Sequence, residues 1–294
     1  MLRRTYVPWL AALCLVPVAA AQFPPFEVID YPGASATLAF GINDDGDVVG
    51  HYRDGQQLWR GFLLRAGEFT TIEYPGAAQT TLFRVNSGGD IAGAYYDGSR
   101  KQHGFLLSHG RYATTDVPGA GQPMVYGLNS RGDVTGMYFA PGDSLKHFGF
   151  VMAGGRFTTI DFPSPNDMSC GTWIGDSGEV AGHVREANGA YHGYRWTDGR
   201  FTLVELPGGE QGQFWDSLYE ITAAGDLLGT YSDPQGRQRA FLMRDGAVTT
   251  FDVPGARRTR ATSMNRSGQV VGMFVDGDGV THGFRTRMAP PPAP

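Results

Sequence analysis

Cysteine is almost absent from this sequence, with only Cys14 and Cys170 among 294 residues. Cys14 lies in an N-terminal segment that we expect to be removed on export, so the mature chain cannot form an intramolecular disulfide. This excludes the small secreted folds that are held together by disulfides, and stability must come from packing. Cys170 is expected to be a partly buried, unreactive thiol.

An excess of basic charge is also missing, because 24 Lys and Arg stand against 29 Asp and Glu and the formal net charge is −5. A mildly acidic chain gives no reason to expect nucleic acid or an anionic membrane as a partner. After residue 21 no apolar run is long enough to cross a bilayer, so we predict no membrane span.

The N-terminus has the three parts of a secretory signal. Two arginines, Arg3 and Arg4, precede an apolar stretch from Val7 to Val18, and small residues follow at Ala19–Ala21. We predict cleavage after Ala21 and a secreted or periplasmic protein. A membrane anchor is the alternative, but the apolar stretch is short and contains two prolines. The arginine pair leaves the Sec and twin-arginine routes both open.

A repeat of 43 to 47 residues fills the rest of the chain, and three series of landmarks keep its register. The prolines are Pro32, Pro75, Pro118, Pro163, Pro207 and Pro254. The glycines within a second apolar strand are Gly50, Gly93, Gly136, Gly182, Gly229 and Gly272. The aromatic residues that follow a small residue are Phe62, Phe105, Phe150, Tyr194, Phe241 and Phe284, and we expect them to be buried at equivalent points.

Turn residues divide each repeat into four strands. In the second repeat the expected strands are Thr80–Val85, Asp90–Tyr96, Gly104–Leu107 and Tyr112–Asp116. Asn86–Gly89, Asp97-Gly98 and His109-Gly110 separate them, and all three are hairpin sequences. Successive hairpins exclude a parallel β-helix, and the missing 3.6-residue apolar period excludes a helical solenoid. The sequence therefore predicts an all-β, six-bladed β-propeller of four-stranded antiparallel blades.

The two ends of the repeat region complement each other. Phe26–Tyr31 is a fourth strand without the preceding three, and the last repeat lacks a fourth strand after His282–Arg287. We expect these two strands, 26–31 and 282–287, to pair and close the ring. The predicted organisation is a signal peptide at 1–21, one propeller domain at 22–287 and a disordered, proline-rich tail at 288–294.

The repeated pattern is Asn-x-x-Gly-x-Val/Ile-x-Gly, then His-Gly-Phe, then Phe-Thr-Thr-Ile-Asp-x-Pro-Gly. It resembles the HAF-type extracellular repeat of exported bacterial proteins. The likeness covers nearly all of the mature chain and is best at Gly89–Gly119 and Ser267–Phe284. Glycine stands where the family name implies alanine, except at Ala240. The resemblance implies export and a repeat fold, and it supplies no catalytic residues.

Histidines and acids that could carry chemistry recur at equivalent positions. One position holds His103, His192 and His282, with His147 one residue out of register and Arg60 and Arg239 in other repeats. Because equivalent positions spread around a ring and arginine does not bind metals, we interpret these residues as bridges between strand ends and predict no metal site and no cofactor.

An acid precedes each landmark proline, at Asp30, Glu73, Asp116, Asp161, Glu205 and Asp252. We interpret these acids as caps for backbone N–H groups of the following loop. Motifs of serine hydrolases, zinc proteases, cysteine nucleophiles and phosphate loops do not occur.

The repeats differ most in the loops on one face of the expected disc, which are those after the fourth strand and between the second and third. Binding is expected there, through tryptophans flanked by charged side chains. The candidate residues are Trp59, Arg60, Asp167, Glu210, Trp215, Asp216, Arg257, Arg258 and Arg260.

Three classes of function fit these observations. The preferred one is an exported, monomeric, non-enzymatic module that binds or scaffolds an extracellular or cell-envelope glycan or protein. The second is a hydrolase or lyase acting on a polysaccharide or lactone, which needs Asp167, Glu210 or Asp216 to converge with another acid or a histidine at the channel mouth. The third is a structural envelope component without a ligand.

Overall fold

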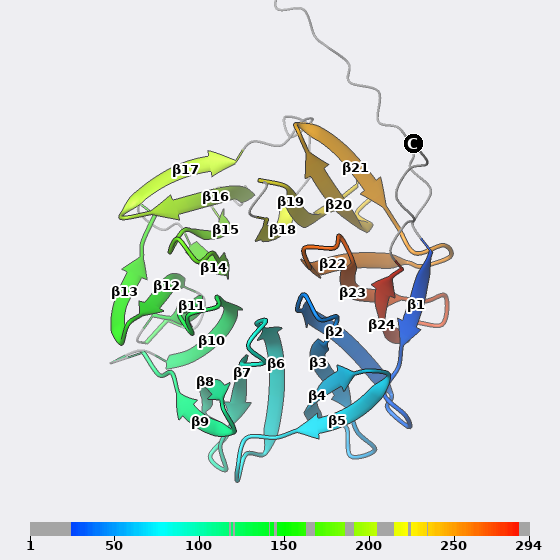
Figure 1. Cartoon of the computed structure of the whole chain (residues 1–294), viewed down its shortest axis with the longest axis horizontal. Helices are drawn as coiled ribbons and strands as arrows, with labels where there is room; N and C mark the ends of the chain where they lie inside the picture. The colour runs from blue at the N-terminus through cyan, green and yellow to red at the C-terminus, as the bar shows by residue number, and fades with distance from the viewer. Residues whose placement is uncertain are drawn as a thin grey trace, which may run out of the picture.

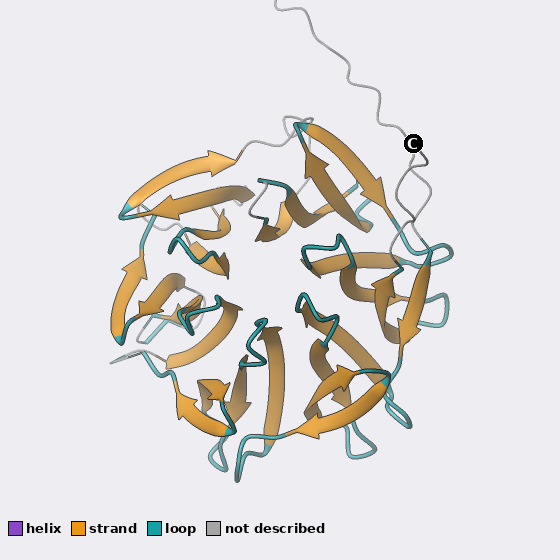
Figure 2. Cartoon of the chain, viewed as in Figure 1, coloured by secondary structure: helices purple, strands orange, loops and turns teal. Residues whose placement is uncertain are grey.

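A computed structural model describes residues 25–117, 119, 121–140, 142–143, 146–162, 168–185, 191–204, 215–222, 225–233 and 235–287, with the backbone alone at 121, 191 and 215–217. Six four-stranded antiparallel sheets stand radially around one axis (Figure 1). Strands and connecting loops make up the described residues (Figure 2), and no helix among them could span a membrane. The predicted six-bladed β-propeller is confirmed.

The first three blades follow one another along the chain. Blade 1 consists of β2 (Ala36–Ile42), β3 (Val48–Arg53), β4 (Trp59–Arg65) and β5 (Glu68–Ile72). Blade 2 consists of β6 (Gln79–Val85), β7 (Ile91–Tyr96), β8 (Gln102–Ser108) and β9 (Arg111–Thr114). Blade 3 consists of β10 (Gly121–Leu128), β11 (Val134–Phe139), β12 (His147–Ala153) and β13 (Arg156–Ile160).

The last three blades complete the ring. Blade 4 consists of β14 (Met168–Ile174), β15 (Val180–Arg185), β16 (Tyr191–Thr197) and β17 (Arg200–Val204). Blade 5 consists of β18 (Trp215–Ile221), β19 (Leu227–Ser232), β20 (Gln238–Arg244) and β21 (Ala247–Phe251). Blade 6 consists of β22 (Arg258–Met264), β23 (Val270–Val275), β24 (Thr281–Thr286) and β1 (Phe26–Ile29).

The N-terminal strand closes the ring, as the sequence predicts. β1 pairs antiparallel with β24, with Phe26 opposite Thr286 and Ile29 opposite Gly283. Figure 1 shows β1, in blue, at the outer edge of the blade that holds β22–β24, which grade from orange to red. The predicted signal peptide and the predicted tail lie outside the described residues.

The repeated aromatic residues form the centres of the blades. The side chains of Phe62, Phe105, Phe150, Tyr194, Phe241 and Phe284 are all fully buried. The glycine before most of them allows the next blade to approach, because a Cβ built on Gly61 would lie 2.7 Å from the side chain of Leu82. Both the repeat register and the expected reason for the glycine are therefore confirmed.

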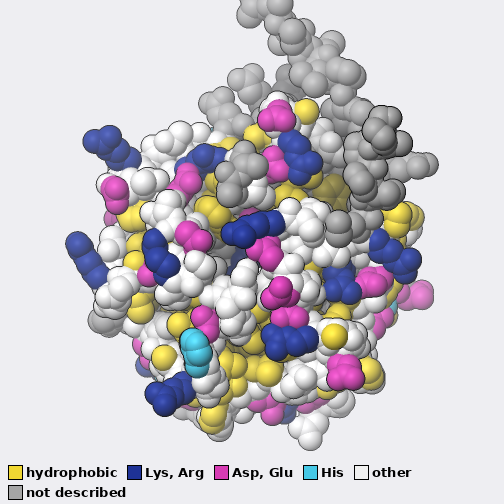
Figure 3. Space-filling view, viewed as in Figure 1, with side chains coloured by type: hydrophobic (Ala, Val, Ile, Leu, Met, Phe, Trp, Pro, Cys, Tyr) yellow, Lys and Arg dark blue, Asp and Glu magenta, His cyan; other side chains and the backbone are white. Residues whose placement is uncertain are grey.

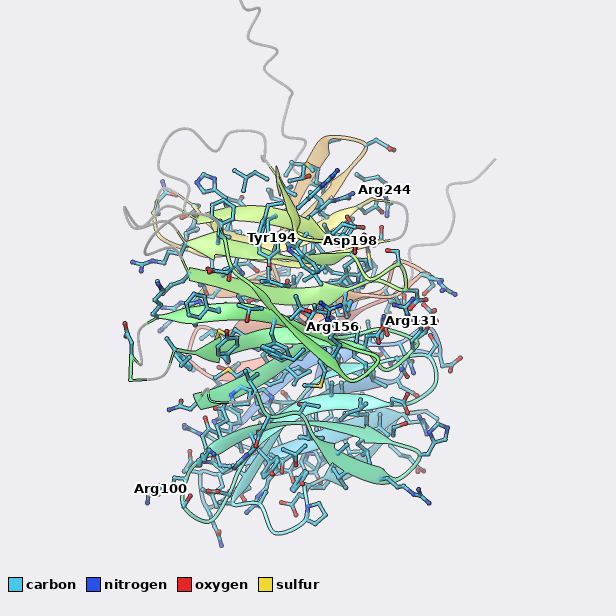
Figure 4. All side chains as sticks on the ribbon, turned by 90° about the vertical axis from the view of Figure 1, so that its left-hand side faces the viewer. Arg100, Arg131, Arg156, Tyr194, Asp198 and Arg244 are labelled. Atoms are coloured by element: carbon cyan, nitrogen blue, oxygen red, sulfur yellow. The ribbon has the colours of Figure 1, made fainter. Side chains whose placement is uncertain are left out.

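One face of the disc carries the turns that begin with asparagine. Arg131 and Arg244 mark this face at the right of Figure 4, and Arg100 marks the opposite face at lower left. Figure 3 shows the asparagine face, with acidic and basic side chains interspersed over the middle of the ring.

Hydrogen bonds on the asparagine face pass from blade to blade. The side-chain amide of Asn43 donates to the carbonyl of Asn86, Asn86 donates to Asn129, and Asn129 donates to Gly175. Across the closure, Asn265 donates to the carbonyl of Asn43. The repeated asparagine is thus a turn residue that also bonds the next blade.

The opposite face, which we call the Pro-Gly face after its loops, is tied together by charges. In four blades a basic residue lies between two acids, and these trios are Asp54–Arg60–Glu73, Asp97–His103–Asp116, Asp233–Arg239–Asp252 and Asp276–His282–Asp30. Each trio joins a turn, a third strand and the end of an outer strand. The structural interpretation of His103 and His282 is confirmed.

The capping role expected for the acids before proline is wrong in these blades, because their carboxylates bond the basic side chains instead. Threonine hydroxyls accept from the loop N–H groups. Thr37 accepts from Tyr31 at 2.9 Å, and Thr80 accepts from Tyr74 at 3.0 Å. An arginine or histidine at the third-strand position is a stronger partner for a carboxylate than a backbone amide.

The trio in blade 6 makes ring closure sensitive to pH. Burial alone would lower the pKa of His282, but hydrogen bonds with Asp30 and Asp276 outweigh it and raise the pKa above its ordinary value. The protonated form is therefore favoured in the folded state. Its stabilising contribution is complete below about pH 6.5 and is lost as the pH rises through the raised pKa.

We predict that His282→Arg abolishes this pH dependence, because arginine occupies the same position in blades 1 and 5 and stays charged. In urea unfolding between pH 6 and 9, the wild type should lose about 0.5–1 kcal/mol relative to the variant. His109→Arg is the control, since the side chain of His109 is 91% exposed. If the free energy of unfolding of the wild type and of His282→Arg changes with pH in the same way, His282 is not the group that causes the pH dependence.

Candidate ligand-binding site

Each inner strand carries a β-bulge at the same place, and the bulges direct six side chains toward the axis. At this place the pairing register skips one residue in each of the six inner strands. The skipped residues are Phe40, Phe83, Tyr126, Thr172, Tyr219 and Thr262. All six line a central cavity of about 350 Å³. Bulges commonly re-aim side chains in this way, and the volume is within the range of small-ligand pockets, about 300–1,000 Å³.

The cavity has an aromatic half, formed by blades 1 to 3. The ring centroids of Phe40 and Phe83 are 5.1 Å apart, and those of Phe83 and Tyr126 are 4.9 Å apart, both edge to face. His51 stacks on Phe40 from behind, with centroids 4.9 Å apart. These contacts hold the rings in fixed orientations, so the aromatic wall is formed before any ligand arrives.

Blades 4 to 6 supply the other half of the wall, which is more polar. Its bulge residues are Thr172, Tyr219 and Thr262. The hydroxyl of Thr172 donates to the carbonyl of Leu218 and that of Thr262 to Ala39, so both side chains are fixed by neighbouring blades. A ligand in this cavity therefore meets apolar rings on one side and oxygen atoms on the other.

The residue after each bulge is Gly41, Arg84, Gly127, Trp173, Glu220 or Ser263. Arg84 and Glu220 are the charged members of this series, and their blades, 2 and 5, stand opposite each other in a ring of six. Arg84 Nη1 lies 3.3 Å from Glu220 Oε2. This buried ion pair spans the axis, and Arg84 forms part of the cavity floor near the asparagine face.

The pair and its hydrogen-bond partners together join five blades. Arg84 donates through Nε to the carbonyl of Tyr126 at 3.0 Å, and through Nη2 to the carbonyls of Tyr219 at 2.9 Å and Thr172 at 3.4 Å. Glu220 Oε2 accepts from Ser263 Oγ at 2.9 Å and from the Met264 N–H at 3.0 Å, both in blade 6.

Burial acts against both charges of the pair. It raises the pKa of Glu220 and lowers that of Arg84, and the attraction between the two groups opposes both changes. Because a guanidinium keeps its proton at any ordinary pH and Glu220 accepts two further hydrogen bonds, the pair is ionised at neutral pH.

The cavity wall nearer the Pro-Gly face contains Met137, His147, Cys170, His183 and Arg260. Burial lowers the pKa of His183 to about 4, so this side chain is neutral at physiological pH. Cys170 is buried, and burial raises its pKa to about 12, so little of the thiol ionises at neutral pH. Across the described part of the chain, no cluster of three His, Cys, Asp or Glu could hold a metal ion.

Arg260 is the member of the predicted binding face that lines the cavity. Trp59 packs beside the cavity, with its ring 5.0 Å from that of His51 and 5.0 Å from the Arg53 guanidinium. Arg60 is held in a charged trio, at 2.9 Å from Asp54.

The remaining predicted residues do not reach the cavity or cannot be placed. Arg257 Nη2 donates to the carbonyl of Gly277, and Arg258 is exposed at the start of β22. Asp167 and Glu210 lie outside the described residues, as do the side chains of Trp215 and Asp216. The convergence of acids that a hydrolase or lyase would need thus stays a prediction.

Sequence reasoning missed the bulge residues and the Arg84–Glu220 pair. Functional residues were expected at non-repeating positions in loops, whereas the bulge residues and the ion pair vary within a regular strand. Aligning the six inner strands shows two opposite charges among glycine, tryptophan and serine at equivalent positions. Two charged residues at positions that are uncharged in the other four repeats were the signal present in the sequence.

No protein-family model matches the chain, and no curated protein matches it in sequence. Solved structures do resemble it. A mutant of the Aleuria aurantia lectin with a bound fucosyl disaccharide has a TM-score of 0.54 at 10% identity, over 85% of this chain and 91% of the lectin. A putative TolB from Agrobacterium tumefaciens has a TM-score of 0.55 at 14% identity, over 91% of each chain.

A third similar structure is a puromycin-hydrolysing peptidase from Mycobacterium tuberculosis. Its TM-score is 0.52 at 13% identity, over 90% of this chain and 54% of the peptidase. A lectin, a TolB and a peptidase share this architecture at such low identity, so the likeness establishes the fold alone.

Proposed function

We propose that this chain is an exported, non-enzymatic binding protein that holds one sugar residue of a glycan in its central cavity. The observation that carries the proposal is the two-sided wall of the cavity. A sugar ring has an apolar C–H face, which would pack on Phe83 and Tyr126, and hydroxyl groups, which would face Thr172, Tyr219 and Thr262.

Two further points support the assignment. A similar six-bladed propeller is a lectin described as having a fucose recognition mode. The N-terminal signal pattern and the resemblance to HAF-type extracellular repeats support export, where glycans of the cell envelope are the available ligands.

The experiment is a glycan-array screen of the mature chain, followed by calorimetric titration of the best ligand. Phe83→Ala removes the middle ring of the aromatic wall and is predicted to weaken binding by about tenfold or more, equivalent to about 1.4 kcal/mol.

Phe69→Ala is the matched control, because this ring packs on Phe62 and Tyr31 in the outer part of blade 1. It should change stability and leave affinity unchanged. Equal affinities for the wild type and Phe83→Ala would show that the sugar binds elsewhere. If no glycan on the array binds the protein and a protein partner is captured instead, the glycan assignment is contradicted.

A further inference from the structure

The cavity contains an arginine whose charge has no partner among the side chains that the structure describes. Arg260 donates one hydrogen bond, from Nε to Gln238 Oε1 at 2.9 Å. Its two terminal nitrogens have no partner among the described residues, and no described carboxylate lies within ion-pair distance. Gln238 thus fixes the Nε edge of the guanidinium.

The other arginine of the cavity wall, Arg84, already has an ion-pair partner and hydrogen-bond partners. Arg84 is neutralised by Glu220 and satisfied by three backbone carbonyls. His183 is neutral at physiological pH, because burial lowers its pKa to about 4. Arg260 therefore gives the wall a positive charge that no described carboxylate balances, although the whole protein is acidic, with a net charge of −5.

A partly buried guanidinium without a described counter-charge can be neutralised by an anionic ligand. Its two terminal nitrogens match the geometry of a carboxylate, which can accept two parallel hydrogen bonds. Arg260 belongs to blade 6, which stands opposite blade 3 and Tyr126. A ring packed on the aromatic half thus presents its far edge to this arginine.

We propose that the sugar held in the cavity is an acidic one, whose carboxylate pairs with Arg260. This inference rests on the proposed function and names the class of its ligand. The aromatic half packs on the face of the sugar ring, and the threonines and Tyr219 accept hydrogen bonds from its hydroxyl groups. Arg260 distinguishes a uronic acid from the corresponding neutral sugar.

The test compares matched sugars that differ only in the charged group. The mature chain is titrated by calorimetry with galacturonate against galactose, and with glucuronate against glucose. At least one acid should bind about tenfold or more tightly than its neutral partner. Arg260→Gln should remove this preference, whereas Arg260→Lys should retain part of it.

Arg266→Gln is the matched control, because it makes the same charge change on the asparagine face, where the side chain of Arg266 is 84% exposed. It should leave the preference intact. Thermal unfolding of each variant shows whether it is folded. Equal binding of acidic and neutral sugars, or a preference that survives Arg260→Gln, would overturn the inference while glycan binding stands. Failure of all four sugars to bind would overturn this inference, and the glycan array decides the proposed function separately.

Discussion

Replacing Arg84 with methionine is expected to lower the free energy of unfolding by about 3–5 kcal/mol. The variant would leave the Glu220 carboxylate buried without its counter-ion, and three backbone carbonyls at the axis would lose a donor. Removing one member of a buried pair is costly because the remaining charge stays out of water. Urea unfolding at neutral pH measures the loss.

The double variant Arg84→Met/Glu220→Met separates the charge effect from packing. Replacing both members of a buried pair by apolar residues of similar volume is often nearly neutral, so the double variant should regain most of the lost stability. If Arg84→Met alone costs less than about 1 kcal/mol, the pair does not hold opposite blades together.

Removing β1 is expected to have the largest effect of all. Phe26 packs edge to face on Phe274 and Phe284, with centroids 6.3 and 6.4 Å away. Asp30 pairs with His282, and Tyr31 stacks on Tyr52 of blade 1 at 3.6 Å. Without the strand, blade 6 has an open edge and its contact with blade 1 is lost.

A mature chain that lacks residues 22–32 should therefore lose its cooperative thermal transition and aggregate, since the lost contacts are comparable with the total stability of an ordinary domain, about 5–15 kcal/mol. Circular dichroism and gel filtration would measure both effects. A synthetic peptide covering 22–32, added to the shortened chain, should restore part of the transition by strand addition. An unchanged transition in the shortened chain would disprove closure by β1.

The repeat architecture was predictable because it depends on local chemistry. Hairpin residues such as Asn86, Asp97 and Gly110 set the strand ends, so the expected strands of the second repeat agree with β6–β9 to within two residues. The closing strand was predictable from the incomplete units at the two ends. Its observed extent, Phe26–Ile29, is two residues shorter than predicted.

The cavity was not predictable in the same way, because its residues come together only when six strands meet around an axis. A bulge at Phe40 or Phe83 has no local sequence signal, and its consequence depends on the register with the next strand. The Arg84–Glu220 pair joins residues 136 positions apart. The acids before proline were misassigned for a related reason, since their basic partners lie on another strand.

The most direct measurement of the central claim is a crystal structure of the mature chain soaked with galacturonate or glucuronate, whichever binds more tightly. We expect a sugar ring in the central cavity, packed on Phe83 and Tyr126, with its carboxylate on Arg260. A well-ordered sugar bound between blades or on the outer rim, with the central cavity free of it, would contradict binding in the cavity.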